Sequence, residues 1–102
     1  MSRSATENYP VDSNMIEKSV TVINKAGLHA RAASKLVGLT SGFSSKIRIG
    51  HEKMVDGKSI LSLMMLAAVK GTTLKVITDG DDEEEAMAAI LALINDRFEE
   101  DQ

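Results

Sequence analysis

The 102-residue sequence has no cysteine, no tryptophan and a single proline, and only 3% of its residues are aromatic. Without cysteine the chain can form neither a disulfide framework nor a thiolate centre. The scarcity of aromatic rings removes the stacking platforms of single-strand binders, and a formal net charge of -3 disfavours contact with phosphate backbones. We therefore expect no nucleic-acid partner and a core built from aliphatic side chains.

Long hydrophobic runs are also missing. No run is long enough to cross a bilayer, and the first residues lack the basic-then-apolar pattern of a signal peptide. We expect no membrane insertion and a cytoplasmic location, which the absence of cysteine suits. With two histidines and no His-x-x-x-His pair, the sequence predicts no metal site and indicates no cofactor.

The length fits one domain with a modest core. Residues 1–14 are polar and show no periodicity, so we expect a disordered tail there and a folded domain over residues 15–102.

Alternation and helical spacing predict seven elements in the order βαββαβα. The strands are predicted at residues 16–23, 44–50, 53–55 and 72–78. The helices are predicted from residue 28 or 29 to about 41, between Ser59 and Lys70, and from the acidic stretch after Asp81 to about Phe98. Asp81 and Glu84 resemble a capping box for the last helix. Each strand has one apolar face, which predicts a two-layer α+β domain whose sheet is covered by helices on one side only.

Between the first strand and the first helix lies a segment that contains Gly27, His29 and Arg31. A lone histidine at such a junction is more often a helix cap, a surface residue or a satisfied core group. Three features favour a phosphoryl acceptor instead. Glycine permits a sharp turn, Arg31 can bind phosphate oxygens, and the amides of Ala30 and Arg31 at the helix start attract anions. His51 is interpreted as a surface turn residue.

Ser59 precedes a short and very apolar helix, where a serine is normally just a cap worth about 1 kcal/mol. A phosphate on its hydroxyl would also be tolerated at a helix N-terminus, so Ser59 is a second candidate site. So short a helix cannot bury all its apolar residues. We therefore expect an exposed surface that docks partners, formed by Ile60, Leu61 and Met64.

The sequence resembles the HPr phosphocarrier family of the bacterial phosphoenolpyruvate-dependent phosphotransferase system. The resemblance runs from about Ile16 to Phe98 and rests on Gly27-Leu28-His29-Ala30-Arg31, on Lys58-Ser59-Ile60-Leu61 with Met64 and Leu66, and on Lys70-Gly71. It implies an open-faced β-sandwich with a four-stranded antiparallel sheet and three helices on one face. The acidic, alanine-rich residues 83–90 and the methionine-rich helix are similar to the nitrogen-related regulatory branch.

The resemblance also implies roles for particular residues. His29 would take a phosphoryl group on Nδ1 from phosphorylated enzyme I and pass it to an EIIA-type acceptor in sugar transport or nitrogen regulation, and Arg31 would help to hold the phosphate. Ser59 matches the serine that HPr kinase/phosphorylase modifies in some members. Ile60, Leu61 and Met64 match the partner-docking surface. The protein would be a monomeric carrier rather than an enzyme.

One position departs from the family motif, because Ala32 stands where a proline usually follows the arginine. Either residue is tolerated in the first turn of a helix, and alanine keeps an amide that proline lacks. Two other functions remain open at this point: a regulatory module that binds a partner through the Ser59 face, and a small anion-binding domain without phosphotransfer.

Overall fold

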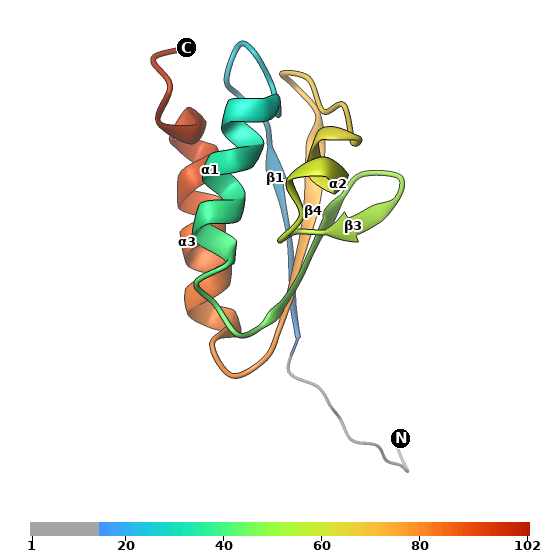
Figure 1. Ribbon diagram of the computed structural model, residues 1–102, viewed down its shortest axis with the longest axis vertical. Helices are drawn as coiled ribbons and strands as arrows, with labels where there is room; N and C mark the ends of the chain where they lie inside the picture. The colour runs from blue at the N-terminus through green and yellow to red at the C-terminus, as the bar shows by residue number, and fades with distance from the viewer. Residues whose placement is uncertain (1–14) are drawn as a thin grey trace.

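The computed structural model describes residues 15–102, so the predicted tail at 1–14 lies outside the described residues. The elements follow in the predicted order, with a 3-10 turn, η1, after the last helix (Figure 1). They are β1 (Ile16–Thr21), α1 (Ala30–Thr40), β2 (Lys46–Gly50), β3 (Met54–Asp56), α2 (Ile60–Met64), β4 (Thr73–Asp79), α3 (Glu83–Asn95) and η1 (Arg97–Glu99).

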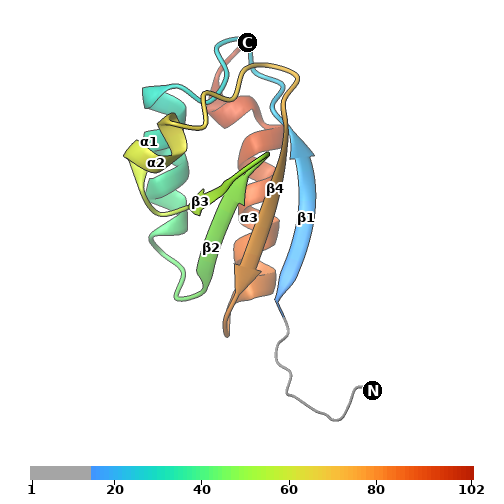
Figure 2. The same cartoon turned by 90° about the vertical axis from the view of Figure 1, so that its right-hand side faces the viewer.

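The four strands form one antiparallel sheet in the order β1-β4-β2-β3. The apolar parity of the strands sets the register, since Val20 lies opposite Leu74 and Ile49 lies opposite Val76. The helices lie on one side of this sheet and its other face is open (Figure 2). The predicted α+β open-faced β-sandwich with three helices on one face is therefore confirmed.

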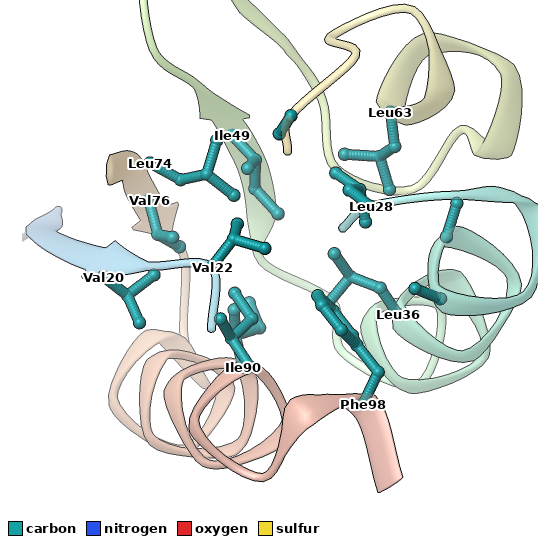
Figure 3. Close-up of a cluster of buried hydrophobic side chains, with 14 of the residues drawn as sticks. Val20, Val22, Leu28, Leu36, Ile49, Leu63, Leu74, Val76, Ile90 and Phe98 are labelled. Carbon is teal, nitrogen blue, oxygen red and sulfur yellow. The ribbon is translucent and has the colours of Figure 1, made fainter. Parts of the chain in front are cut away.

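The core lies between the sheet and the helices and is aliphatic apart from Phe98 (Figure 3). Helix α1 contributes Leu36, helix α3 contributes Ile90, and the sheet contributes residues such as Val76, all with no exposed surface. Leu63 is the one fully buried residue of α2. Within residues 15–102 no helix is long and apolar enough to cross a membrane.

The second helix is shorter than predicted, because it ends at Met64 and not near Lys70. Ala67 has a left-handed backbone with φ of 51°. The amides of Leu66 and Ala67 close tight turns onto the carbonyls of Leu63 and Met64. An alanine in this conformation carries no sequence signal, so the apolar run reads as a longer helix than it forms.

The last helix also differs at both ends. The predicted capping box of Asp81 and Glu84 is wrong, because the N-cap is Asp82 and its side chain makes no bond to its own helix. Instead Glu83 folds back and its Oε1 accepts from the Gly80 amide at 2.9 Å. At the other end Phe98 leaves the helix for η1, although it is fully buried as the apolar stripe predicted.

The Asp82 carboxylate ties the α3 start to the loop before β2. It accepts from the Ser44 amide at 2.9 Å, from the Ser45 amide at 3.0 Å and from the Ser45 hydroxyl at 2.5 Å. The Ser45 hydroxyl and the Ser44 amide are the main reasons that the Asp82 pKa falls from 3.8 to about 2. A lowered pKa means that the carboxylate stabilises the folded state above about pH 4, and that this contribution is lost as the pH falls through about 2.

We predict that Asp82→Asn lowers the midpoint of thermal unfolding at pH 7, because the ionised acceptor of three hydrogen bonds is lost. The difference from the unsubstituted protein should narrow as the pH is lowered from 4 towards 2. Asp81→Asn is the matched control, since Asp81 is exposed and lies next in the chain. A difference between Asp82→Asn and the unsubstituted protein that stayed constant from pH 7 to 2 would contradict this account.

Candidate functional site

The candidate site begins at a turn that only glycine can make. Gly27 has φ of +76°, and a Cβ on it would lie 2.5 Å from the Ala68 carbonyl oxygen. The next residue, Leu28, donates its amide to that same oxygen at 2.8 Å and buries its side chain in the core. The turn before α1 is thereby fastened to the segment that follows α2.

His29 follows this turn as the N-cap of α1, with extended backbone angles. Its Nδ1 accepts from the Arg31 amide at 3.3 Å, and the first backbone bond of the helix runs from the Ala33 amide to the His29 carbonyl at 2.8 Å. The ring is one-third exposed. Nδ1 therefore faces the unpaired amides and the positive dipole end of α1, as expected for an anion-binding position.

The other ring nitrogen meets a carboxylate that the sequence did not indicate. Nε2 of His29 lies 2.7 Å from Oε2 of Glu100, whose side chain is 14% exposed. Oε1 of the same carboxylate accepts from Nδ2 of the buried Asn24 at 3.0 Å, and Nδ2 also donates to the Gly27 carbonyl at 2.8 Å. One asparagine thus links the turn before the histidine to the carboxylate behind it.

The Glu100 carboxylate is ionised at neutral pH. Its burial would raise its pKa, but the hydrogen bonds from Asn24 and His29, with the electrostatic effect of His29 and Arg31, outweigh burial and lower the pKa below its usual value. The Arg31 side chain is exposed at the start of α1, where it can reach an anion held near Nδ1. Nδ1 thus faces the Arg31 amide at the start of α1, and Nε2 lies beside an anion.

The segment from Ser59 to Val69, which includes α2, exposes several large apolar side chains. Ser59 is the N-cap of α2, as predicted, and its Oγ accepts from the Ser62 amide at 3.2 Å. The large exposed side chains of this region include Leu61, at 69% exposure, and Met65, at 76%. The full set, here called the apolar surface, comprises Ile60, Leu61, Met64, Met65 and Val69.

The apolar surface adjoins the histidine turn, because Val69 follows Ala68 and its Cα would lie 3.0 Å from a Cβ on Gly27. The candidate residues from the sequence therefore fall on two linked segments, one with His29 and Arg31 and one with Ser59 and the apolar surface. Among residues 15–102 no group of three or more histidines, aspartates and glutamates is arranged to hold a metal ion.

Comparison with known proteins decides the family. A family model described as "PTS HPr component phosphorylation site" matches residues 16–96. The chain belongs to the HPr family. It is 53% identical over 83 residues to the phosphocarrier protein HPr of Pseudomonas aeruginosa, and the match covers 79% of this chain and 92% of that protein. It is 38% identical over 88 residues to the phosphocarrier protein NPr of Escherichia coli K12, covering 84% and 98%.

Solved HPr structures have the same fold. The HPr-C-His structure from Thermoanaerobacter tengcongensis matches with a TM-score of 0.82 and 41% identity, over 85% of this chain and 99% of that one. An HPr structure described as a dimer, from the same organism, matches with a TM-score of 0.67 and 43% identity, over 79% and 94%. Like these relatives, the chain is an HPr-type phosphocarrier of the phosphotransferase system, a carrier rather than an enzyme, and it works with protein partners.

Within this HPr fold, sequence reasoning missed Asn24 and Glu100. Asn24 lies in the turn between β1 and α1, and asparagine is a residue type favoured in turns, so a signal existed. No sequence pattern indicated a role for Glu100. It lies in an acidic run after the last helix, and it reaches the site only because Arg97, Phe98 and Glu99 all have left-handed backbones, with φ of 56°, 54° and 66°.

We predict that Gly27→Ala destabilises the fold by about 2 kcal/mol or more, because alanine strains the positive φ and its Cβ meets the Ala68 carbonyl at 2.5 Å. Gly38→Ala is the matched control. Gly38 lies inside α1 with nothing within 4 Å of an added Cβ, so this change should stabilise by about 0.5–1 kcal/mol. Urea unfolding of both variants measures the difference. Equal changes in the free energy of unfolding for the two variants would contradict the close approach of Gly27 to the Ala68 carbonyl.

Proposed function

We propose that His29 is the residue that carries the phosphoryl group, which it accepts from phosphorylated enzyme I and passes to an EIIA-type protein. The observation that carries this proposal is the position of Nδ1 at the start of α1, against the Arg31 amide at 3.3 Å. Phosphoryl transfer needs an in-line nucleophile and donors aimed at the transferred charge, and this position supplies both. The other histidine, His51, lies between β2 and β3, where its Nε2 contacts the Leu66 carbonyl.

In the proposed step the unprotonated Nδ1 of His29 attacks the phosphorus of a phosphohistidine on enzyme I. A new N–P bond forms, and the electron pair of the broken bond stays with the donor nitrogen. The contact from the Arg31 amide to Nδ1 is long, so it costs little to give up. That amide, the Ala30 amide and the Arg31 guanidinium would then donate to the phosphoryl oxygens.

Ala32 fits this proposal although the family motif usually has proline there. Ala32 belongs to the first turn of α1, and its side chain is fully buried. The first amides of a helix have no partner within the helix, so the Ala32 amide is one more donor at the anion-binding end. The replacement therefore removes nothing that the phosphoryl group requires.

We predict that incubation with labelled phosphoenolpyruvate and enzyme I labels the protein on one histidine. His29→Ala should abolish the label, because the attacking nitrogen is gone, and His51→Ala should leave it unchanged. The label should be lost in acid and retained in alkali, as for a phosphohistidine. Full labelling of His29→Ala, or an acid-stable label, would overturn the assignment.

We further propose that partners dock on the apolar surface, with Ile60, Leu61 and Met64 as its main contacts. These side chains are exposed although they are large and apolar, and exposed apolar groups next to a reactive group are typical of a docking site. The link from Leu28 to Ala68 supports one interface that covers both the histidine and this surface.

Ser59 is proposed as a regulatory phosphorylation site for an HPr kinase/phosphorylase. Its half-buried hydroxyl caps α2 beside Ile60, so a phosphate there would put about two negative charges at the edge of the apolar surface. Charge at the edge of an interface mainly slows association with a partner. Phosphorylation at Ser59 would thus reduce phosphoryl transfer from enzyme I without unfolding the helix.

We predict that Ser59→Asp lowers the rate of transfer from enzyme I by roughly tenfold, as expected for a misplaced charge at a docking site. Ser19→Asp is the charge control, since Ser19 is exposed on the open face of the sheet. Ser59→Ala is the capping control and should cost about 1 kcal/mol of stability with little change in transfer. Equal rates for Ser59→Asp and Ser19→Asp would exclude the regulatory role.

Two parts of the proposal concern the setting of the protein. We propose that it acts as a monomer in the cytoplasm. Because one similar HPr structure is described as a dimer, the mass of the protein in solution tests whether it is a monomer. The relatives named HPr and NPr support a role in sugar transport or in nitrogen regulation. Transfer to purified acceptors of each kind distinguishes the two roles.

A further inference from the structure

We propose that Glu100 is a positioning residue for His29: it holds the ring proton on Nε2 and so keeps the Nδ1 lone pair free for phosphoryl transfer. This inference rests on the proposed function of His29. Its structural basis is the 2.7 Å contact between Nε2 and Oε2 of Glu100.

Two independent contacts select the same tautomer of the neutral ring. An ionised carboxylate only accepts hydrogen bonds, so the nitrogen that faces Glu100 must carry the proton. The Arg31 amide only donates, so the nitrogen that faces it, Nδ1, must present a lone pair. The opposite tautomer would place a lone pair against a carboxylate oxygen at 2.7 Å and an N–H against another N–H.

Glu100 is held in place rather than swinging freely. Its Oε1 is fixed by Nδ2 of Asn24, a side chain with no exposed surface. The Lys25 amide donates to the main-chain oxygen of Gln102, so the backbone beyond Glu100 lies along the histidine turn. The carboxylate therefore meets the ring with both of its oxygens engaged, which limits the orientations of the imidazole.

The turn that delivers Glu100 is strained and is anchored in the core. Arg97, Phe98 and Glu99 adopt left-handed angles in succession, which is unfavourable for residues with a Cβ. The Phe98 side chain is fully buried, and its carbonyl accepts from Nζ of Lys35 on α1 at 3.1 Å. Burial of one aromatic ring thus offsets the strain of a turn that directs the chain from the end of α3 to the site.

The contact between Glu100 and His29 also compensates the charge that forms on the ring during transfer. When the Nδ1 lone pair forms the N–P bond, the proton stays on Nε2, so the phosphorylated ring gains a positive charge. That charge forms next to the Glu100 carboxylate, which stabilises it. On transfer to the next protein the N–P bond breaks, its electron pair returns to Nδ1, and the ring is again neutral with its proton on Nε2.

We predict that Glu100→Gln changes the ring tautomer and slows transfer by about tenfold, as for the loss of a charge-assisted hydrogen bond. The amide of the new side chain can donate to Nε2, which favours a proton on Nδ1 instead. Glu99→Gln is the matched control, because it makes the same charge change on the adjacent residue, whose carboxylate contacts Lys35 at 3.4 Å and not the histidine. Glu100→Ala removes the carboxylate without adding a donor.

The experiment has two measurements. Nitrogen-15 chemical shifts of the His29 ring at pH 8 report the tautomer in the unphosphorylated protein. The initial rate of label transfer from enzyme I reports its effect. We expect a proton on Nε2 in the unsubstituted protein and in Glu99→Gln, and a mixed or reversed population with slower transfer in Glu100→Gln. Glu100→Ala should give a mixed population and slower transfer.

The outcomes separate this inference from the function on which it rests. An unchanged tautomer in Glu100→Gln overturns the positioning role, and so does a changed tautomer with an unchanged rate. If the unsubstituted protein takes no label on His29, the proposed function fails, and the ring shifts still test the Glu100 contact. Amide spectra that retain the core signals around Phe98 show that each variant is folded.

Discussion

One carbonyl oxygen, that of Ala68, sets the relation between His29 and the apolar surface. It accepts from the Leu28 amide at 2.8 Å and lies so close to Gly27 that no side chain fits between them. Because Leu28 is buried and His29 follows it directly, this contact fixes the start of α1. Because Val69 follows Ala68, the same contact fixes the edge of the apolar surface. A partner that covers one of them therefore meets the other in a defined position.

The fold around this contact follows from local patterns that a sequence displays. Alternation in the strands placed Val20 and Val76 on the covered face, and helical spacing placed Leu36 and Ile90 against them. The order of elements, the single covered face and the Ser59 cap could be predicted, since each depends on residues close together in the chain. The HPr motif likewise marked His29 and Arg31.

The structural features that the sequence did not predict depend on backbone conformations that the residue types do not indicate. Ala67 and the three residues from Arg97 to Glu99 are left-handed without being glycine, so neither the early end of α2 nor the reversal after α3 could be inferred. The Asp82 carboxylate likewise bonds across the fold to Ser44 and Ser45 and not within its own helix. Contacts that join distant segments need the tertiary structure, and Glu100 beside His29 is the functional example.

His29 is both the cap of α1 and the proposed carrier of the phosphoryl group, and these roles use the same lone pair of Nδ1. Forming the N–P bond removes the acceptor that the Arg31 amide now contacts. The phosphoryl oxygens would replace it, and an anion at a helix start contributes about as much as a neutral cap, roughly 0.3–1 kcal/mol. The helix therefore need not fray when the group arrives or leaves. What must stay still is the ring, and in the proposed mechanism Glu100, which contacts the nitrogen that takes no part in the bond, would hold it in both states.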